Sequence, residues 1–233
     1  MYDMKAVILA GGKGTRLKPY TVSLPKPLVP IGDKPILEII INQLREHNIE
    51  DIILAVGHLA EIIMAYFKDG KDLGVKIKYS IEKEPLGTAG PLRILKNELK
   101  ETFLVMNGDI LTLLNFSSLI ESHKKMRAIA TVAITKRTVD IDFGVVNLSK
   151  DGKIINYIEK PKNEYYVSMG VSVFEPEVIK YIPEGKFDFP DLISKLVKSG
   201  EKVEGYVYDG FWLDIGRPED YERANAEYYK LFK

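Results

Sequence analysis

The sequence predicts an α/β fold in which a parallel sheet carries helices on both of its faces. In the first half of the chain, short apolar runs of strand length alternate with segments whose apolar residues recur at helical spacing. Alternating strands and helices are typical of this layered arrangement. The 233 residues are 45% hydrophobic and 28% charged, which is sufficient for one substantial core.

The elements of the first half follow one another in a regular order. The expected strands are residues 5–10, 51–56, 75–82 and 102–107, and the expected helices are residues 36–47, 60–68 and 88–99. The helix at 36–47 has Pro35 at its start, where proline is favoured. Its apolar residues recur at helical spacing and are expected in the core: Ile36, Ile39, Ile40 and Leu44.

The second half is richer in strands. After a helix near 115–126, strands are expected at 128–135, 143–149, 153–159 and 166–174, with a turn at Asp151-Gly152. A helix at 189–198, a strand at 203–208 and a last helix from Pro218 to about Leu231 complete the order. The chain contains no linker, repeat or low-complexity tract, so residues 1–233 are expected to form a single domain.

Composition excludes several classes of function. The 33 basic and 33 acidic side chains balance, which argues against a nucleic-acid surface. There is no 18-residue apolar span and no basic-then-apolar leader, so we expect a cytoplasmic protein without a membrane segment. Without cysteine there is no disulfide or thiolate zinc site. The scattered His47, His58 and His123 are expected at the surface or at helix ends.

A glycine-rich turn follows the first strand, in the stretch "VILAGGKGTRLKPYTVSLPKPLVPIGDKP" at residues 7–35. Glycines after a strand allow backbone amides to approach an anion closely, and phosphate is the anion we expect here. The spacing excludes two familiar phosphate loops. A dinucleotide fingerprint would need Gly at Leu17, and a P-loop would need Gly at Val7 and Ser or Thr at Gly14.

Two cations lie in this segment. Arg16 follows the last glycine, and Lys26 stands between Pro25 and Pro27 in a loop stiffened by five prolines. A residue that precedes proline is held in an extended backbone, so the Lys26 ammonium is expected to have a fixed direction. The alternative is an ordinary strand-to-loop connection with surface cations.

Two aspartates are the best acidic candidates. Asp109 follows "FLVMN" and Asp214 follows "GFWL", each at the expected carboxyl end of a strand, which is where open α/β sheets bind ligands. One or two carboxylates together with phosphate oxygens are the ligands that Mg²⁺ prefers. Alternatively, Asp109 is a turn residue and Asp214 caps the last helix.

These segments together resemble the sugar-1-phosphate nucleotidylyltransferases, or nucleotide-sugar pyrophosphorylases. After "LAGGKGTRLKPYT" and "PKPLVPIGDKP", five further blocks occur in the family's order: "EPLGTAGPL" (84–92), "NGD" (107–109), "FGVV" (143–146), "IEKP" (158–161) and "GFWLDIGRPEDY" (210–221). The resemblance implies a Rossmann-like three-layer αβα fold with a mixed, mainly parallel sheet and a small β-rich part that closes over the sugar. Since only 19 residues follow Asp214, a C-terminal left-handed β-helix, with its acyltransferase activity or trimerisation, is not expected.

The resemblance also implies which residues form the site. The catalytic residues would be Arg16, Lys26 and Asp109, with Mg²⁺ bound by Asp109 and Asp214. The nucleotide would be bound by Leu9, Ala10, Gly11, Gly12, Gly14, Thr15, Arg16, Glu82, Gly87 and Thr88. The sugar phosphate would be bound by Gly144, Glu159, Lys160, Ser168 and Gly170.

The family assigns a role to each charged group. Arg16 would hold the departing pyrophosphate, Lys26 the α-phosphate, Glu159 the sugar hydroxyls and Lys160 the sugar phosphate. Glu159 and Lys160 could instead form a surface ion pair, and Lys13 is expected to be solvated. Many relatives read Asn-Ala-Gly or Thr-Gly where this chain reads Ser168-Met169-Gly170, which leaves the identity of the sugar open.

Glu82 bears on the choice of base, because it aligns with a Gln that reads the pyrimidine in thymidylyl and uridylyl relatives. A carboxylate only accepts hydrogen bonds, and guanine offers two adjacent donors whereas uracil and thymine offer one. GTP is therefore favoured. The loop "GTAGPL" most resembles that of the mannose-1-phosphate guanylyltransferases, which implies mannose 1-phosphate as the acceptor. Alternatively, Glu82 pairs with a loop cation while backbone groups of residues 86–88 read the base.

The expected reaction is a direct in-line attack of the sugar phosphate on the α-phosphorus, which needs no covalent intermediate. The expected partners are a nucleoside triphosphate and a sugar 1-phosphate, and a homo-oligomer is allowed. Other interpretations stay open: a manno-heptose 1-phosphate guanylyltransferase, a glucose-1-phosphate thymidylyl- or uridylyltransferase, transfer to a non-sugar phosphate, or a non-catalytic nucleotide-sugar-binding regulatory subunit.

Overall fold

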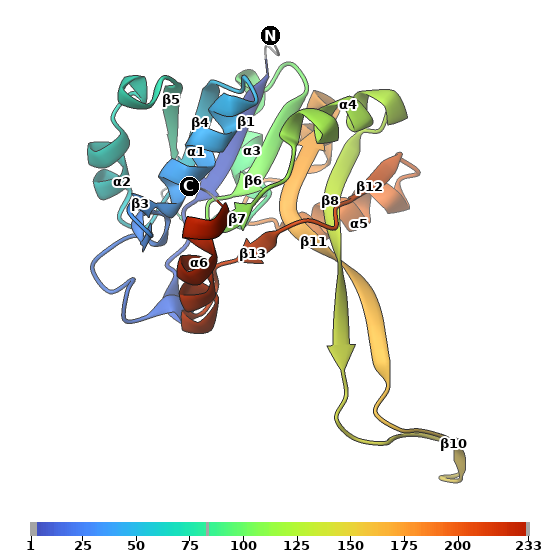
Figure 1. Ribbon diagram of the computed structural model, residues 1–233. Coiled ribbons are helices and arrows are strands. Elements are labelled where there is room, and N and C mark those ends of the chain that lie inside the picture. Colours follow the sequence, from blue (N-terminus) through green and yellow to red (C-terminus); the bar gives the residue numbers. More distant parts are fainter. Residues whose placement is uncertain (1–3, 83, 232–233) are drawn as a thin grey trace.

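A seven-stranded sheet forms the centre of the protein in the computed structural model, which describes residues 4–82 and 84–231 (Figure 1). Its strand order is β12-β8-β11-β6-β1-β4-β5. The strands are β1 (Lys5–Ala10), β4 (Asp51–Val56), β5 (Lys76–Ile81), β6 (Phe103–Asn107), β8 (Ala130–Asp140), β11 (Lys162–Phe174) and β12 (Val203–Val207). Only β11 runs antiparallel to its neighbours β6 and β8, and the other described pairs are parallel. The predicted mixed, mainly parallel sheet is confirmed.

Helices cover both faces of this sheet. One buried apolar cluster contains side chains of α1 (Ile36–Glu46), α2 (Ala60–Phe67), α4 (Phe116–Met126) and α6 (Pro218–Leu231). The other contains side chains of α3 (Gly90–Ile94) and α5 (Phe189–Lys198). Ile8 of β1 packs in the first cluster and Val7 in the second, because successive strand residues point to opposite faces. The three-layer arrangement is therefore confirmed.

The predicted elements agree best where their side chains are buried. The strands at 5–10 and 51–56 have the predicted bounds, and the four core residues of α1 are all buried. The predicted helix at 88–99 is wrong in length: α3 ends at Ile94 and a 3-10 turn covers Leu95–Asn97. Four very short strands were not predicted: β2 (Pro30–Ile31), β3 (Lys34–Pro35), β7 (Ile110–Thr112) and β13 (Trp212–Asp214). No helix within the described residues is long and apolar enough to span a bilayer.

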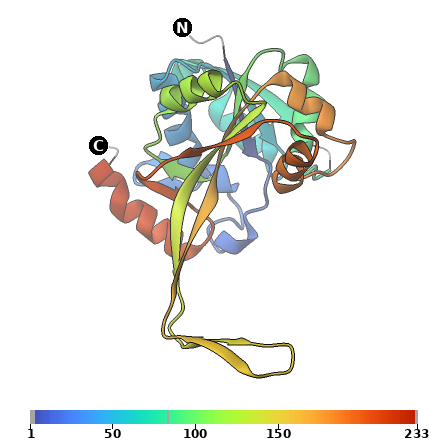
Figure 2. The same ribbon diagram turned by 90° about the vertical axis from the view of Figure 1, so that its right-hand side faces the viewer.

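Strands β8 and β11 continue beyond the sheet as a two-stranded ribbon. The ribbon pairs Thr135 with Val167 and runs to the pair Asp140 and Lys162. It carries a terminal hairpin of β9 (Val145–Leu148) and β10 (Ile154–Ile158), and it projects away from the body (Figures 1 and 2). We call residues 136–167 the arm. The hairpin strands agree with the predicted strands at 143–149 and 153–159. The predicted strands at 128–135 and 166–174 end before the ribbon, because residues 136–140 and 162–165 are mostly exposed and show no burial pattern.

His123 lies in the last turn of α4, which agrees with the predicted helix end, but it is fully buried and not at the surface. Its Nδ1 lies 2.7 Å from Thr131 Oγ1, and its Nε2 lies 3.0 Å from Glu175 Oε1. Burial lowers the pKa of His123, and the neighbouring Glu175 only partly opposes this shift. A neutral ring with Nε2–H donating to Glu175 and Nδ1 accepting from Thr131 satisfies both nitrogens.

This histidine predicts how stability depends on pH. Its folded pKa lies below the ordinary value of 6.5, so the unfolded chain binds a proton that the folded protein does not. The free energy of unfolding should therefore decrease as the pH falls below about 6.5, down through the lower folded pKa. Urea titrations at about pH 7.5 and 5.5 measure the free energy of unfolding. The difference between the two pH values should be smaller for His123→Asn than for the parental protein, although the variant is less stable at both. An equal pH effect in both proteins would contradict this assignment.

Candidate active site

Two adjoining cavities lie at the carboxyl ends of the central strands. The first, of about 680 Å³, is bordered by the glycine turn after β1 and by residues that follow β4, β5 and β6. We call it the glycine-loop cavity. The second, of about 560 Å³, lies between the sheet and α5, and we call it the sheet cavity. Thr88 and Asn107 line both, so two molecules bound in the cavities would lie beside each other.

Most residues predicted to bind the nucleotide line the glycine-loop cavity. These are Leu9, Ala10, Gly11, Gly12, Glu82, Gly87 and Thr88. Gly14, Thr15 and Arg16 do not line it but form the turn next to it, which continues as the 3-10 helix Thr15–Leu17. The binding roles of these residues stay predictions.

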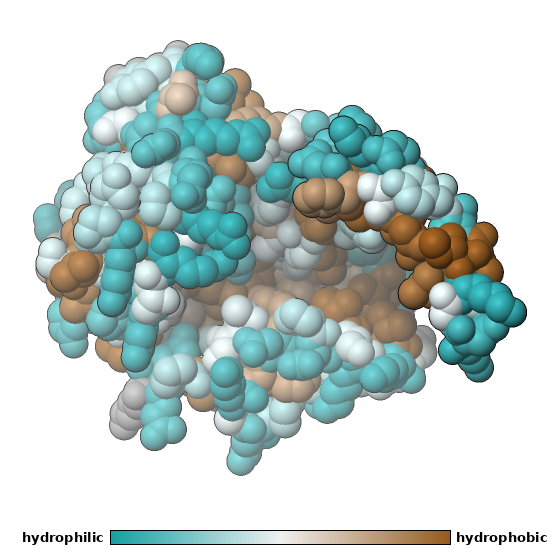
Figure 3. All heavy atoms as spheres, turned by 90° about the horizontal axis from the view of Figure 1, so that it is seen from below, coloured by the Kyte–Doolittle hydropathy of each residue, from teal (hydrophilic) through white to brown (hydrophobic). Residues whose placement is uncertain are grey.

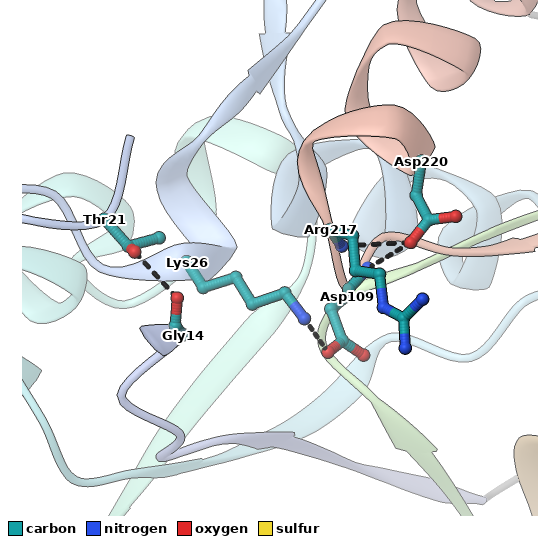
Figure 4. A network of polar contacts seen from close by, with 7 residues as sticks. Gly14, Thr21, Lys26, Asp109, Arg217 and Asp220 are labelled. Carbon is teal, nitrogen blue, oxygen red and sulfur yellow. Dashed lines mark hydrogen bonds and ion pairs between the residues drawn. The ribbon is translucent and has the colours of Figure 1, made fainter. Parts of the chain in front are cut away.

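Gly14 brings the Lys26 segment close to the glycine turn. Its φ of +60° lies in the left-handed region that glycine adopts without strain. A Cβ at this position would lie 3.0 Å from both Lys26 Cβ and Thr21 Cγ2. The Thr21 hydroxyl donates a hydrogen bond to the Gly14 carbonyl at 2.7 Å (Figure 4). Any larger residue at 14 would therefore push Lys26 away from the turn.

Lys26 is directed at Asp109. Its side chain is buried, with 8% of the residue exposed, and its ammonium donates to Asp109 Oδ2 (Figure 4). Asp109 Oδ1 is buried and has no hydrogen-bond partner among the described residues. A buried carboxylate oxygen without a donor is unfavourable unless another group, such as a cation, binds it.

Asp214 lies beside this pair. Strands β7 and β13 pair Asp214 with Ile110, and the Ile215 amide donates to the Asp109 carbonyl at 3.0 Å. Burial raises the pKa of the Asp214 carboxyl, and the charge of Asp109 raises it further, while Lys26 and Arg16 lower it. The fold thus brings together four charged groups from separate segments of the chain. They are the carboxylates of Asp109 and Asp214 and the cations of Lys26 and Arg16.

Asp214 does not cap the last helix. That role belongs to Asp220, whose Oδ2 accepts hydrogen bonds from the Gly216 amide at 3.2 Å and the Arg217 amide at 2.9 Å (Figure 4). The Arg16 guanidinium lies 3.5 Å from the position that a Cβ on Gly216 would take. The Arg16 guanidinium therefore lies next to Gly216, close enough to Asp214 for its charge to lower the pKa of that carboxyl.

The aspartates fit a magnesium ion that is shared with a substrate. No group of three or more His, Asp or Glu within the described residues could hold a metal by itself. Mg²⁺ is usually bound through one or two carboxylates, with phosphates and waters completing its shell. Asp109 and Asp214, with the unpartnered Oδ1, match that pattern.

Glu82 links the end of β5 to the next loop. Its Oε2 accepts a hydrogen bond from the Leu86 amide at 3.0 Å, and its Oε1 lies 3.0 Å from the position of a Cβ on Gly11. Burial raises the pKa of Glu82, and the Leu86 amide partly opposes this. One carboxylate oxygen thus orders the loop, while the other lies beside the glycine turn.

A second network fixes the loop at residues 86–90. Asp188 Oδ1 accepts hydrogen bonds from the Thr88 amide at 2.9 Å and the Thr88 hydroxyl at 3.3 Å. The Phe189 amide in turn donates to Thr88 Oγ1 at 2.8 Å. The Phe187 carbonyl accepts from the amides of Ala89 and Gly90. The loop shared by the two cavities is therefore held by the segment that begins α5.

Removing the Asp188 carboxylate should weaken nucleotide binding. Asp188→Ala leaves the Thr88 amide without its acceptor, which destabilises the bound conformation of the 86–90 loop by about 1–2 kcal/mol. We expect the KM for the nucleoside triphosphate to rise several-fold with little change in kcat. Asp191→Ala, in the first turn of the same helix and exposed, is the control. Equal KM values in the two variants would contradict the positioning role of Asp188.

The residues predicted for the sugar phosphate are divided between two places. Ser168 and Gly170 line the sheet cavity, and Gly170 has a φ of +71° with Asn107 Nδ2 2.6 Å from the position of its missing Cβ. Gly144, Glu159 and Lys160 lie on the arm and line neither cavity. Their binding roles stay predictions.

Comparison with known proteins identifies the family. Residues 5–230 match the family described as nucleotidyl transferase. The chain belongs to this family. It is 41% identical over 242 residues to a UTP–glucose-1-phosphate uridylyltransferase of Synechocystis, covering 95% of this chain and 62% of that protein. The chain thus spans less than two thirds of the length of that relative.

Two further relatives match this chain over almost their whole length. A D-glycero-alpha-D-manno-heptose 1-phosphate guanylyltransferase of Campylobacter jejuni is 37% identical over 221 residues, covering 94% of this chain and 97% of that protein. The crystal structure of HddC from Yersinia pseudotuberculosis complexed with GMP-PN has a TM-score of 0.76 and 28% identity, covering 97% and 99% of the two chains.

The sequence did not assign a role to several residues that line the glycine-loop cavity. These are Lys13, Pro27, Gly57, His58, Glu84, Pro85, Asn107 and Gly108. His58 and Asn107 could have been found by the rule that predicted Asp109, because each lies at or just after the carboxyl end of a parallel strand. Lys13 was expected to be solvated, and it is exposed at the cavity wall.

Proposed function

We propose that the protein transfers a nucleotidyl group from a nucleoside triphosphate to a sugar 1-phosphate and releases pyrophosphate. The observation that carries this proposal is the cluster of Lys26, Asp109 and Asp214 beside Asn107, where the two cavities adjoin. The cluster supplies opposite charges where the phosphates of two substrates would meet. Family membership supports the same reaction.

Each part of the site then has a role in the proposed reaction. The backbone of Gly11 and Gly12 approaches the triphosphate, and Lys26 binds the α-phosphate. Arg16 binds the pyrophosphate that departs. Asp109 and Asp214 would hold Mg²⁺, which neutralises phosphate charge when bound. The sugar phosphate oxygen attacks the α-phosphorus in line, so positioning and charge neutralisation provide the catalysis.

We further propose GTP as the preferred donor and mannose 1-phosphate as the preferred acceptor. Oε1 of Glu82 does not bind the Leu86 amide, and Oε2 keeps a second lone pair beside the one that accepts from that amide, so the two oxygens can accept from the two adjacent donors of guanine. The Campylobacter relative, named a guanylyltransferase for a manno-configured sugar phosphate, supports this choice. The Synechocystis relative, named a uridylyltransferase, supports uracil and glucose instead.

Kinetics with several donors decide between these bases. The parental protein should give a higher kcat/KM with GTP than with UTP or dTTP, measured as pyrophosphate release with mannose 1-phosphate and glucose 1-phosphate in parallel. Glu82→Gln should lower the ratio of kcat/KM with GTP to kcat/KM with UTP or dTTP, since an amide presents one acceptor and one donor. A parental protein that uses UTP or dTTP at least as well as GTP would contradict the guanine assignment but not nucleotidyl transfer.

The same assay separates the other candidate functions. A non-catalytic nucleotide-sugar-binding subunit would release no pyrophosphate with any acceptor. A transferase acting on a non-sugar phosphate would release pyrophosphate with an aminoalkyl phosphate and not with hexose 1-phosphates. A heptose-specific enzyme would prefer a manno-heptose 1-phosphate over mannose 1-phosphate. The carboxylate and lysine cluster favours catalysis over binding alone.

A further inference from the structure

A further cavity lies at the opposite end of the sheet from the two cavities of the candidate active site. Its volume is about 320 Å³, and it is formed where the residues after α3 meet the 3-10 helix Pro176–Tyr181. Lys100 precedes β6, and Pro176 follows β11, which runs antiparallel to β6, so both lie near the amino end of β6. Figure 3 views the molecule from the other end and shows the hollow at the carboxyl ends of the strands. The further cavity is therefore separate from the candidate active site.

Positive charge and apolar groups together form this cavity, which we call the basic pocket. No acidic side chain within residues 4–82 and 84–231 lines it, but four cations do: Arg93, Lys96, Lys100 and Lys180. The other lining residues are apolar: Leu99, Pro176 and Ile179. Leu99 and Ile179 are buried, whereas the three lysines are exposed. The basic pocket therefore has an apolar floor and a positively charged rim.

The three lysines of the rim have no counter-ion in the fold. Lys96, Lys100 and Lys180 form no ion pair with any residue in the described part of the chain. A cleft lined by charges of one sign concentrates their field and attracts ions of the opposite sign. The chain as a whole carries 33 charges of each sign, so this local excess of positive charge does not follow from composition.

The acidic residues of the neighbouring segments do not neutralise the pocket. Glu98 forms an ion pair with Lys78 at 3.0 Å. Glu175 lies 3.0 Å from His123 Nε2 and so faces the buried histidine. Two more acidic residues of these segments are exposed and lie outside the lining of the pocket: Glu101 and Glu177. An anion from solution is therefore needed to balance the lysines.

The fourth cation, Arg93, is held in place by the backbone. Its Nη1 donates a hydrogen bond to the Ile182 carbonyl at 2.8 Å, which fixes the plane of the guanidinium. Its Nη2 pairs with Glu184 at 3.2 Å, but the Glu184 side chain is 89% exposed. An exposed ion pair contributes only about 0–1 kcal/mol, so an anion in the pocket can replace Glu184 at little cost.

We propose that the basic pocket is a second ligand site, which binds a small phosphate ester with an apolar ring. The phosphate would lie among the lysines and Arg93, since ammonium and guanidinium groups both bind phosphate oxygens strongly. The ring would lie on Leu99 and Ile179. A volume of about 320 Å³ is at the lower end of the range for small-molecule sites, which suits a molecule with one ring and excludes a nucleic-acid duplex. This inference does not depend on the proposed reaction.

Phenyl phosphate is the probe that tests this site, because it joins a phosphate to an apolar ring. Proton–nitrogen correlation spectra of the nitrogen-15-labelled protein follow its titration. The amides of residues 93–100 and 176–181 should shift together and saturate with a Kd of about 1 mM. Inorganic phosphate should bind at the same amides at least about threefold more weakly, because it has no ring to bury on the apolar floor.

Charge-reversal variants assign the binding to the pocket. Lys100→Glu and Lys180→Glu change the two sides of the rim, and each should raise the Kd at least about tenfold. Lys125→Glu is the matched control and should keep the parental Kd. Lys125 is also an exposed lysine without an ion pair within the described residues, but it lies in α4, which packs on the other face of the sheet.

Four results would each overturn the proposal. They are the absence of a saturable shift at these amides up to about 20 mM phenyl phosphate, equal affinity for inorganic phosphate, the parental Kd in both pocket variants, and an equal loss of affinity in Lys125→Glu. Circular dichroism melts show whether each variant is folded. The amides of Gly11 and Gly12 report binding in the candidate active site in the same spectra, so failure of this proposal is distinguishable from failure of the proposed function.

Discussion

Asp109→Asn and Asp214→Asn should each lower kcat by roughly two orders of magnitude or more, because each removes a charge that would hold Mg²⁺ on the phosphates in the proposed reaction. The shape of the side chain is kept. In the structure, Asp109 Oδ2 accepts from the Lys26 ammonium, its buried Oδ1 has no hydrogen-bond partner within residues 4–82 and 84–231, and Asp214 lies beside it. In the proposed site the two carboxylates would hold the same ion, so neither would replace the other.

Steady-state turnover and Mn²⁺ binding measured by electron paramagnetic resonance check this prediction. Both variants should lose metal affinity, and Asp209→Asn, at an exposed site between β12 and β13, should lose neither affinity nor turnover. Asp214→Asn should not lower the melting temperature of the metal-free protein. Burial and Asp109 already disfavour the charged Asp214, so the neutral amide removes an unfavourable charge. Near-parental turnover of both variants in limiting Mg²⁺ would show that the metal assignment is wrong.

Lys26→Ala should lower kcat by roughly two orders of magnitude with a smaller effect on the KM of either substrate. In the proposed reaction the α-phosphate gains charge and contacts in the transition state, and the Lys26 ammonium, which is buried and held by Asp109, would stabilise that state. Initial rates with each substrate varied in turn measure this division. A variant with parental kcat and a raised KM would show that Lys26 binds the ground state and the transition state equally.

Lys160→Ala is the informative comparison for Lys26→Ala. Lys160 is exposed on the arm, outside both cavities. If Lys160 binds the sugar phosphate, as the resemblance implies, its loss should mainly raise the KM for the sugar 1-phosphate. Parental values for both substrates would instead show that Lys160 of the arm has no part in binding.

Burial decided which elements could be predicted from the sequence. Strand β4 is apolar on both faces, since the sheet is covered by helices on both sides, and its bounds were predicted correctly. The ribbon of β8 and β11 was predicted too short. Its outer residues are exposed, and only the pairing of 136–140 with 162–166 keeps them extended. Because the two paired segments are more than 20 residues apart in the chain, neither has a local sequence pattern that predicts the pairing.

The site shows the same contrast between local and long-range features. The glycine turn, Lys26 and Asp109 could be found because short motifs mark them. The contact between Asp109 and Asp214 depends on β7 and β13, which have three residues each and are too short for a periodic signal. Asp188 was missed because its partner Thr88 lies 100 positions away, and a single Asp before a helix predicts no more than a cap.

Phosphorus-31 NMR of the reaction mixture tests the central claim most directly. The parental protein is mixed with Mg²⁺, GTP and mannose 1-phosphate, and the phosphorus species are followed with time. Nucleotidyl transfer predicts that the triphosphate and sugar phosphate signals decrease together, while GDP-mannose and pyrophosphate appear in equal amounts. The Asp109→Asn variant should leave the spectrum unchanged over the same period. Formation of GDP and inorganic phosphate without a nucleotide-sugar, or an unchanged spectrum with GTP, UTP and dTTP alike, would contradict it.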